Sequence, residues 1–145
     1  MRSVLKQILL YLCLFLGVAT LKAQHVEYGV ALDTNYMMIG DQQHLTFKAK
    51  VDPGVRIVFP RLQDTVVHGL EIISGPVRDS VKEKDGRWLL EEKYVVTAFD
   101  TGVYVVPPQP ITIESQEYNN IVRTDPVGLV VNTFQVDPSS KIGRA

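Results

Sequence analysis

The stretch AFDTGVYVVPPQP, from Ala98 to Pro110, decides how the rest of the sequence is interpreted. It places an aspartate, a glycine and a tyrosine at alternate positions, with valines and then prolines after them. An acidic residue in a loop can belong to a catalytic site, but no histidine, lysine or second carboxylate stands close by in sequence to complete one with Asp100. The strand-like residues on both sides favour a structural corner instead.

Each residue of this corner has a predicted part. The Asp100 side chain can cap the turn, and Gly102 permits a positive φ. In immunoglobulin-like sandwiches a tyrosine at this corner bonds back to the backbone through its hydroxyl, which is the part predicted for Tyr104. A cysteine follows that tyrosine by two residues in antibody domains, whereas here the position is Val106. The core is therefore expected to have no disulfide.

The remainder of the chain has the alternation of β-strands. In HLTFKAKV, from His44 to Val51, apolar residues alternate with polar ones, which indicates a half-buried strand. Seven to nine short strands separated by turns predict an all-β, immunoglobulin-like antiparallel sandwich over residues 24–136. A closed barrel is the alternative, but Pro107, Pro108 and Pro110 disfavour an uninterrupted central strand.

Local signals add three expectations within the sandwich. Asp85-Gly86 predicts a hairpin, and Asn119-Asn120 predicts a turn between strands. Trp88 is the only tryptophan and lies in an apolar strand pattern, so it is expected in the core.

The first 23 residues have the pattern of a secretory signal peptide, with a helical apolar segment. Arg2 and Lys6 precede an apolar run that is too short for an ordinary membrane span, and cleavage is expected after Ala23. An uncleaved anchor is the alternative. Cys13 lies inside the apolar run rather than after it, so lipid attachment is not expected. The protein is expected to be exported, and residues 137–145 to form a flexible tail of a truncated chain.

The chemistry-bearing residues form no recognisable catalytic or metal-binding set. The formal charge of the 145 residues is −1, with no basic run that would indicate a nucleic-acid partner. Three scattered histidines and a single cysteine do not make a zinc motif. We therefore expect no enzyme activity, no catalytic residues, no metal and no cofactor.

One loop is a candidate for binding a partner. Pro60, Arg61, Gln63 and Asp64 follow a predicted strand, and loops on a rigid sandwich are common binding sites. A plain connector between strands is the alternative interpretation.

Three stretches resemble the N-terminal extracytoplasmic region of BatD-like (Bacteroides aerotolerance, or oxygen-tolerance) proteins: residues 32–54, 59–74 and 97–108. The resemblance covers about residues 26–136 and includes the Asp100 to Tyr104 corner. It implies a cell-envelope scaffold of immunoglobulin-like modules in the periplasm or facing it from the inner membrane. It also implies protein partners, namely membrane proteins with von Willebrand A domains and a MoxR-type ATPase. Membrane association would then come through a partner or through a C-terminal helix missing from this sequence.

The leading functional hypothesis is therefore a non-enzymatic protein–protein interaction module of the envelope. The alternative is a carbohydrate-binding sandwich, for which the candidate aromatic residues are Tyr36, Trp88 and Tyr118.

Overall fold

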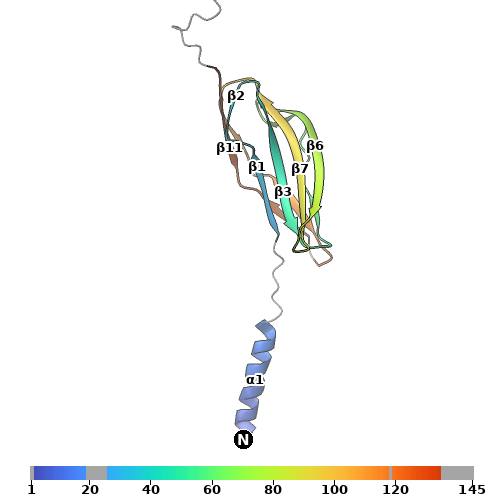
Figure 1. The fold of residues 1–145 in the computed structure, drawn as a ribbon. Helices are drawn as coiled ribbons and strands as arrows, with labels where there is room; N and C mark the ends of the chain where they lie inside the picture. The colour runs from blue at the N-terminus through green and yellow to red at the C-terminus, as the bar shows by residue number, and fades with distance from the viewer. Residues whose placement is uncertain (1, 19–25, 118, 135–145) are drawn as a thin grey trace, which may run out of the picture.

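The computed structural model describes residues 2–18, 26–117 and 119–134. Helix α1 (Arg2–Val18) is followed by strands that form two layers around one apolar core (Figure 1). The predicted all-β sandwich is confirmed. Its first layer is a five-stranded antiparallel sheet in the order β1 (Glu27–Leu32), β3 (Gln42–Val51), β7 (Trp88–Ala98), β6 (Leu70–Lys82) and β5 (Thr65–Val67).

The second layer consists of two three-stranded sheets. One has the order β10 (Asn119–Arg123), β9 (Pro110–Glu114) and β4 (Arg56–Val58). The other has the order β2 (Tyr36–Met38), β11 (Val127–Asn132) and β8 (Gly102–Val106). All described strand pairs are antiparallel except β2 with β11, which run parallel.

The described residues contain eleven strands, more than the seven to nine predicted, because the second layer is interrupted twice. Pro107 and Pro108 separate β8 from β9, and residues 124–126 separate β10 from β11. The two interruptions are bonded to each other. Gln109 N–H donates to Thr124 Oγ1 at 2.9 Å, and Thr124 N–H donates to the Gln109 carbonyl at 2.9 Å. The break between β8 and β9 and the break between β10 and β11 therefore lie side by side in the second layer.

The alternation in β3 sets the core of the first layer. Leu45, Phe47, Ala49 and Val51 are all buried and face the second layer. The ring centroid of Phe47 lies 6.0 Å from that of Phe59 and 6.2 Å from that of Tyr94. These rings, rather than the tryptophan, supply the aromatic part of the core.

Three expectations about individual segments need correction or confirmation. The prediction for Trp88 was wrong: it lies at the first position of β7 and is 36% exposed, because it borders a hollow of about 310 Å³ that Gly54 and Arg78 also line. Asn119 and Asn120 begin β10 instead of forming the turn before it. The hairpin at Asp85-Gly86 is confirmed, with Glu83 N–H donating to the Arg87 carbonyl at 2.8 Å.

The N-terminal segment is helical from Arg2 to Val18, and several of its apolar side chains are exposed: Val4, Leu5, Ile8, Leu9, Leu10 and Leu12. In the described part of the chain no helix has the length and apolar character required to span a membrane. The expected cleavage point after Ala23, the tail at residues 137–145 and Tyr118 lie outside the described residues.

Candidate interaction surfaces and their supporting contacts

The corner between β7 and β8 is closed by a hydrogen bond from a side chain to the backbone. Tyr104 Oη donates to the carbonyl oxygen of Asp100 at 2.8 Å. Gly102 has φ +151°, in the region that favours glycine. The expectation that the Asp100 carboxylate caps the turn was wrong, because within the described residues that side chain makes no hydrogen bond. Asp100 contributes its main-chain carbonyl instead.

The ring of Tyr104 also holds a second turn, between β5 and β6. Gly69 has φ +87°, and a Cβ atom on it would lie 2.7 Å from Tyr104 Cε1. A real Cβ does not come this close to another carbon atom without displacement. Gly69 is therefore required both by its backbone conformation and by the tyrosine ring beside it.

The candidate loop after β4 is bonded to a buried tyrosine that the sequence analysis did not identify. Tyr94 is fully buried, and its hydroxyl donates to the Pro60 carbonyl at 3.3 Å and accepts from Leu62 N–H at 3.2 Å. A buried hydroxyl needs such partners, since leaving it unpaired costs free energy. Tyr94 thus connects the loop to the centre of the five-stranded sheet.

The candidate loop exposes polar side chains on a backbone that hydrogen bonds hold in place. Arg61, Gln63 and Asp64 are exposed, and Pro60 is half-buried. Asp64 has φ +64°, which is uncommon for a residue other than glycine, and its carbonyl accepts from Ile72 N–H at 2.8 Å. These three polar side chains are therefore displayed by a backbone that is held at both ends.

A different surface stands out for its lack of charge. None of the strands β2, β8 and β11 contains a charged residue. The register places Tyr36 beside Val130 and Val130 beside Val103, with Gly128 beside Val105 in the next row. Their neighbours Leu129, Val131 and Val106 are buried, so this set faces solvent. We call the set of Tyr36, Val103, Val105, Gly128 and Val130 the valine face.

The exposed side chains of the valine face are large and apolar. Val103 is 74% exposed, and Val105, Val130 and Tyr36 are also exposed. A hollow of about 510 Å³ adjoins the face, lined by Tyr36, Met38, Thr101, Asn132 and Thr133. Contiguous exposed apolar side chains with no charge among them are typical of interaction sites.

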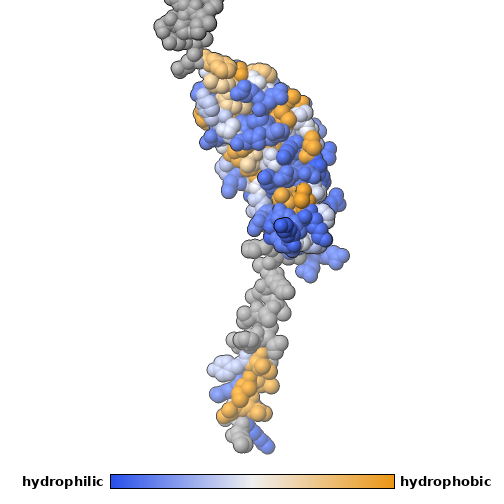
Figure 2. All heavy atoms as spheres, viewed as in Figure 1, coloured by the Kyte–Doolittle hydropathy of each residue, from blue (hydrophilic) through white to orange (hydrophobic). Residues whose placement is uncertain are grey.

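The outer side of the five-stranded sheet has the opposite character. Lys48 Nζ lies 3.6 Å from Glu91 Oε1, and Lys93 Nζ lies 3.7 Å from Glu91 Oε2. Figure 2, viewed from the side of β1, β3, β7 and β6, shows a largely hydrophilic surface with separate hydrophobic areas. The outer side of the five-stranded sheet therefore differs from the valine face in the paired charges that it carries.

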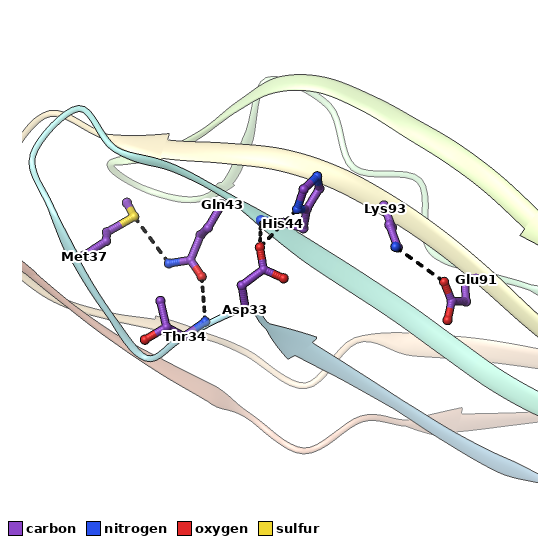
Figure 3. Close-up of polar contacts among 7 residues, drawn as sticks. All are labelled: Asp33, Thr34, Met37, Gln43, His44, Glu91 and Lys93. Carbon is purple, nitrogen blue, oxygen red and sulfur yellow. Dashed lines mark hydrogen bonds and ion pairs between the residues drawn. The ribbon is translucent and has the colours of Figure 1, made fainter.

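The crossing from β1 to β2 is fixed by two adjacent residues of β3 (Figure 3). His44 N–H donates to Asp33 Oδ2 at 2.9 Å, and the same oxygen lies 3.0 Å from His44 Nδ1. Gln43 is buried; its Oε1 accepts from Thr34 N–H at 3.1 Å, and its Nε2 lies 3.3 Å from Met37 Sδ. The backbone hydrogen bond from His44 lowers the pKa of Asp33 below its usual value. These contacts place β2, and with it Tyr36, beside β11.

A charged cluster ties the β6–β7 hairpin to β3. Lys50 Nζ lies 3.0 Å from Asp85 Oδ2 and 3.3 Å from Glu83 Oε2. Its hydrogen bond with Asp85 is the main reason that the pKa of Lys50 is raised. The backbone N–H of Arg87 lowers the pKa of Asp85 more than Lys50 does. Each charge has an opposite partner, so the cluster has the character of a structural contact.

The remaining polar side chains are dispersed over the sandwich. Among the described residues no group of three His, Cys, Asp or Glu side chains is placed to hold a metal ion. Glu91 and Glu92 face opposite sides of their strand, where Glu92 lies 3.9 Å from Arg78. The aromatic candidates Tyr36 and Trp88 belong to different sheets, in β2 and β7.

Comparison with known protein families finds no matching family, and comparison with curated proteins finds no match.

Proposed function

We propose that this protein is a non-enzymatic interaction module that binds another protein through the valine face. The observation that carries the proposal is the exposed apolar row of Tyr36, Val130 and Val103 on strands that contain no charged residue. Burial of apolar area is the main favourable term in protein association, and interface centres are depleted in charge.

The hydrogen bonds that hold the strands of the valine face favour a rigid docking surface. Val103 and Val105 lie on a strand that starts at the Tyr104 to Asp100 hydrogen bond. Tyr36 is placed by the contacts of Gln43 and His44 to the preceding loop. A surface that is ordered before binding loses little conformational entropy when a partner docks.

The partner is proposed to be an envelope protein reached after export. The exposed apolar side chains of α1 support an export segment, since such a helix is unfavourable in water. The resemblance to BatD-like proteins adds membrane proteins with von Willebrand A domains and a MoxR-type ATPase system as the proposed partner class. Polar contacts from Arg61, Gln63 and Asp64 are a second proposed part of the same interaction.

The test measures how much of the partner protein each of two valine variants recovers from an envelope extract of the native host. Val103→Lys places a charge at the most exposed side chain of the valine face, at the β8 end of the Tyr36, Val130 and Val103 row. Val77→Lys is the matched control, because Val77 is 67% exposed but lies on β6, outside this face. We expect Val103→Lys to reduce recovery of the partner at least about tenfold, equivalent to about 1.4 kcal/mol, and Val77→Lys to leave it unchanged.

Two results would contradict the proposal. Equal recovery with both variants would remove the valine face as the binding site. A stable homodimer of the wild-type chain that Val103→Lys dissociates would show that the face binds a second copy instead of another protein.

The carbohydrate-binding hypothesis receives less support. A sugar platform generally needs aromatic side chains grouped on one surface. Tyr36 and Trp88 lie in separate sheets, so these two do not form such a group. A glycan array probed with the wild-type chain and with Trp88→Ala tests this hypothesis, and a glycan signal that Trp88→Ala abolishes would restore it.

A further inference from the structure

Strand β1 is the edge of the five-stranded sheet. It pairs with β3 on one side, and the described residues provide no strand on its other side. An edge strand presents unpaired backbone N–H and C=O groups that can bind another strand. The question is whether this edge is protected, as exposed edges usually are.

The other long edge of the sheet is protected by its sequence. Beyond the short pairing with β5, β6 contains Pro76 and the charged residues Arg78, Asp79 and Lys82, and its register is irregular between Ile72 and Val77. Proline, charge and bulges are the usual means of preventing strand addition. In β1 the only charged residue is Glu27, at its first position, and its register with β3 is continuous. Strand β1 therefore lacks these protections.

Two hollows flank the middle of β1. The first has a volume of about 340 Å³ and lies on the outer side of the sheet, with Gly29, Ala31, Thr46, Lys48, Lys50 and Leu89 in its lining. The second has a volume of about 220 Å³ and lies between β1 and residues 123–125. Tyr28, Gly29 and Val30 line both. An added strand would run between these two hollows, with alternate side chains directed toward each.

The outer hollow fits apolar side chains. Gly29 and Ala31 leave space beside Thr46 and Leu89, and Thr46 is buried although it faces outward. The two lysines in the lining have carboxylate partners: Lys48 pairs with Glu91, and Lys50 pairs with Glu83 and Asp85. Their hydrocarbon stems are thus left to line the hollow.

The second hollow fits polar side chains. Arg123 and Asp125 are exposed on its far side, and Thr124 lies between them. A peptide whose residues alternate between apolar and polar would match both hollows at once. That alternation is also the pattern of a half-buried β-strand.

A second copy of this chain does not fit the outer hollow. The outward-facing residues of β1 are Glu27, Gly29 and Ala31, since Val30 and Leu32 pack against the core. An antiparallel β1–β1 pair keeps outward-facing residues on the same side. The partner strand would then offer only glycine, alanine and glutamate to the hollow, which would remain unfilled.

We propose that the edge of β1 binds an extended segment of another protein by strand addition, with apolar side chains of that segment in the Gly29–Ala31 hollow and polar ones facing Arg123. Main-chain hydrogen bonds supply affinity in this mode, and the hollows for alternate side chains supply selectivity. This site is separate from the valine face and does not depend on it.

The test uses two synthetic peptides of identical composition. One alternates valine with serine over eight residues and carries a lysine pair for solubility; the other has the same residues with the valines grouped together. Backbone amide NMR of the full chain is recorded with each. The Asp33 N–H to His44 carbonyl bond sets the register in which Gly29 and Ala31 also bond to β3, so the N–H groups of Tyr28 and Val30 point away from it. We expect only the alternating peptide to slow hydrogen exchange at Tyr28 and Val30 and to shift the amides of β1.

Two matched glycine variants locate the effect. A Cβ atom at Gly29 or at Gly128 meets no atom within 4 Å, and neither glycine has a positive φ, so both positions accept a side chain without strain. Gly29→Glu places a charge in the outer hollow and is expected to weaken peptide binding at least about tenfold. Gly128→Glu alters the valine face and is expected to leave peptide binding unchanged while reducing recovery of the partner protein.

Several results would overturn the proposal. These are equal binding of the two peptides, no binding of either, or equal sensitivity to the two glycine variants. Slow exchange at Tyr28 and Val30, the amides that point away from β3, before any peptide is added would show that the chain covers its own edge. A concentration-dependent dimer that Gly29→Glu dissociates would assign the edge to a second copy.

Discussion

The ring of Tyr104 lies against Gly69, so that a Cβ atom on this glycine would be 2.7 Å from Tyr104 Cε1. The same tyrosine donates a 2.8 Å hydrogen bond to the Asp100 carbonyl. One side chain therefore fixes the corner before β8 and the turn before β6. Since β8 carries Val103 and Val105, these contacts also support the proposed docking surface.

Replacing Gly69 should be more costly than replacing a glycine with the same backbone conformation in open space. Gly69 and Gly54 both have φ +87°, but only at Gly69 does an added Cβ meet a side chain. We expect Gly54→Ala to lower the free energy of unfolding by about 1–2 kcal/mol through backbone strain alone. Gly69→Ala should lower it by about 2–5 kcal/mol, because overpacking is added to that strain. Urea denaturation measures both, and equal losses would contradict the Tyr104 contact.

Removing the Tyr104 hydroxyl isolates the corner hydrogen bond. Tyr104→Phe keeps the ring against Gly69 but leaves the Asp100 carbonyl without its donor. Because Tyr104 is half-buried, we expect a loss of about 0.5–1.5 kcal/mol in the free energy of unfolding. A Tyr104→Phe variant as stable as the wild type would show that water replaces the hydroxyl at no cost.

Removing the Tyr94 hydroxyl should loosen the candidate loop as well as destabilise the fold. Tyr94→Phe leaves Pro60 O and Leu62 N–H without their buried partner, at a cost of about 1–3 kcal/mol. Hydrogen exchange at the Leu62 amide should become faster than the global loss of stability explains. Tyr36→Phe is the control, because that hydroxyl is exposed and contacts only the Met38 thioether among the described residues. Unchanged exchange at Leu62 in Tyr94→Phe would show that the Tyr94 hydroxyl does not hold the loop in place.

Acid should weaken the fold through Asp33. Its pKa is lowered, first by the His44 backbone N–H, so the ionised carboxylate is favoured in the folded chain. The resulting stabilisation is complete above the unfolded pKa of about 3.9 and is lost as pH falls through the lower folded value. Thermal unfolding between about pH 6 and pH 2 should therefore show a weaker acid dependence in Asp33→Asn than in the wild type. Identical acid dependence in the two chains would rule out this contribution.

The sequence predicted the elements whose burial alternates and missed those that depend on distant contacts. Strand β3 was clear because Leu45, Phe47 and Ala49 are buried on one side. The second half of β6 was missed because residues 73–82 are all exposed, which removes the alternation. Strands β2 and β5 have three residues each and depend on pairing with β11 and β6.

The candidate surfaces were less predictable than the fold. The valine face combines residues from three strands, and the sequence alone does not place Tyr36 beside Val130. Tyr94 appeared as one apolar residue of a long strand, and only the structure brings its hydroxyl to the loop at Pro60. The Gly69 to Tyr104 contact also joins distant segments. The valine face, the Tyr94 contact and the Gly69 to Tyr104 contact all depend on which strands lie next to one another. Local sequence patterns do not determine that order.

Photo-crosslinking in the native host tests the central claim most directly. A benzoylphenylalanine is introduced in place of Val103 in one chain and in place of Val77 in another, two exposed valines on opposite layers of the sandwich. The proposed function predicts that irradiation links the first chain to another envelope protein and leaves the second unlinked. An adduct only at the Val77 position, or no adduct at Val103, would contradict docking through the valine face.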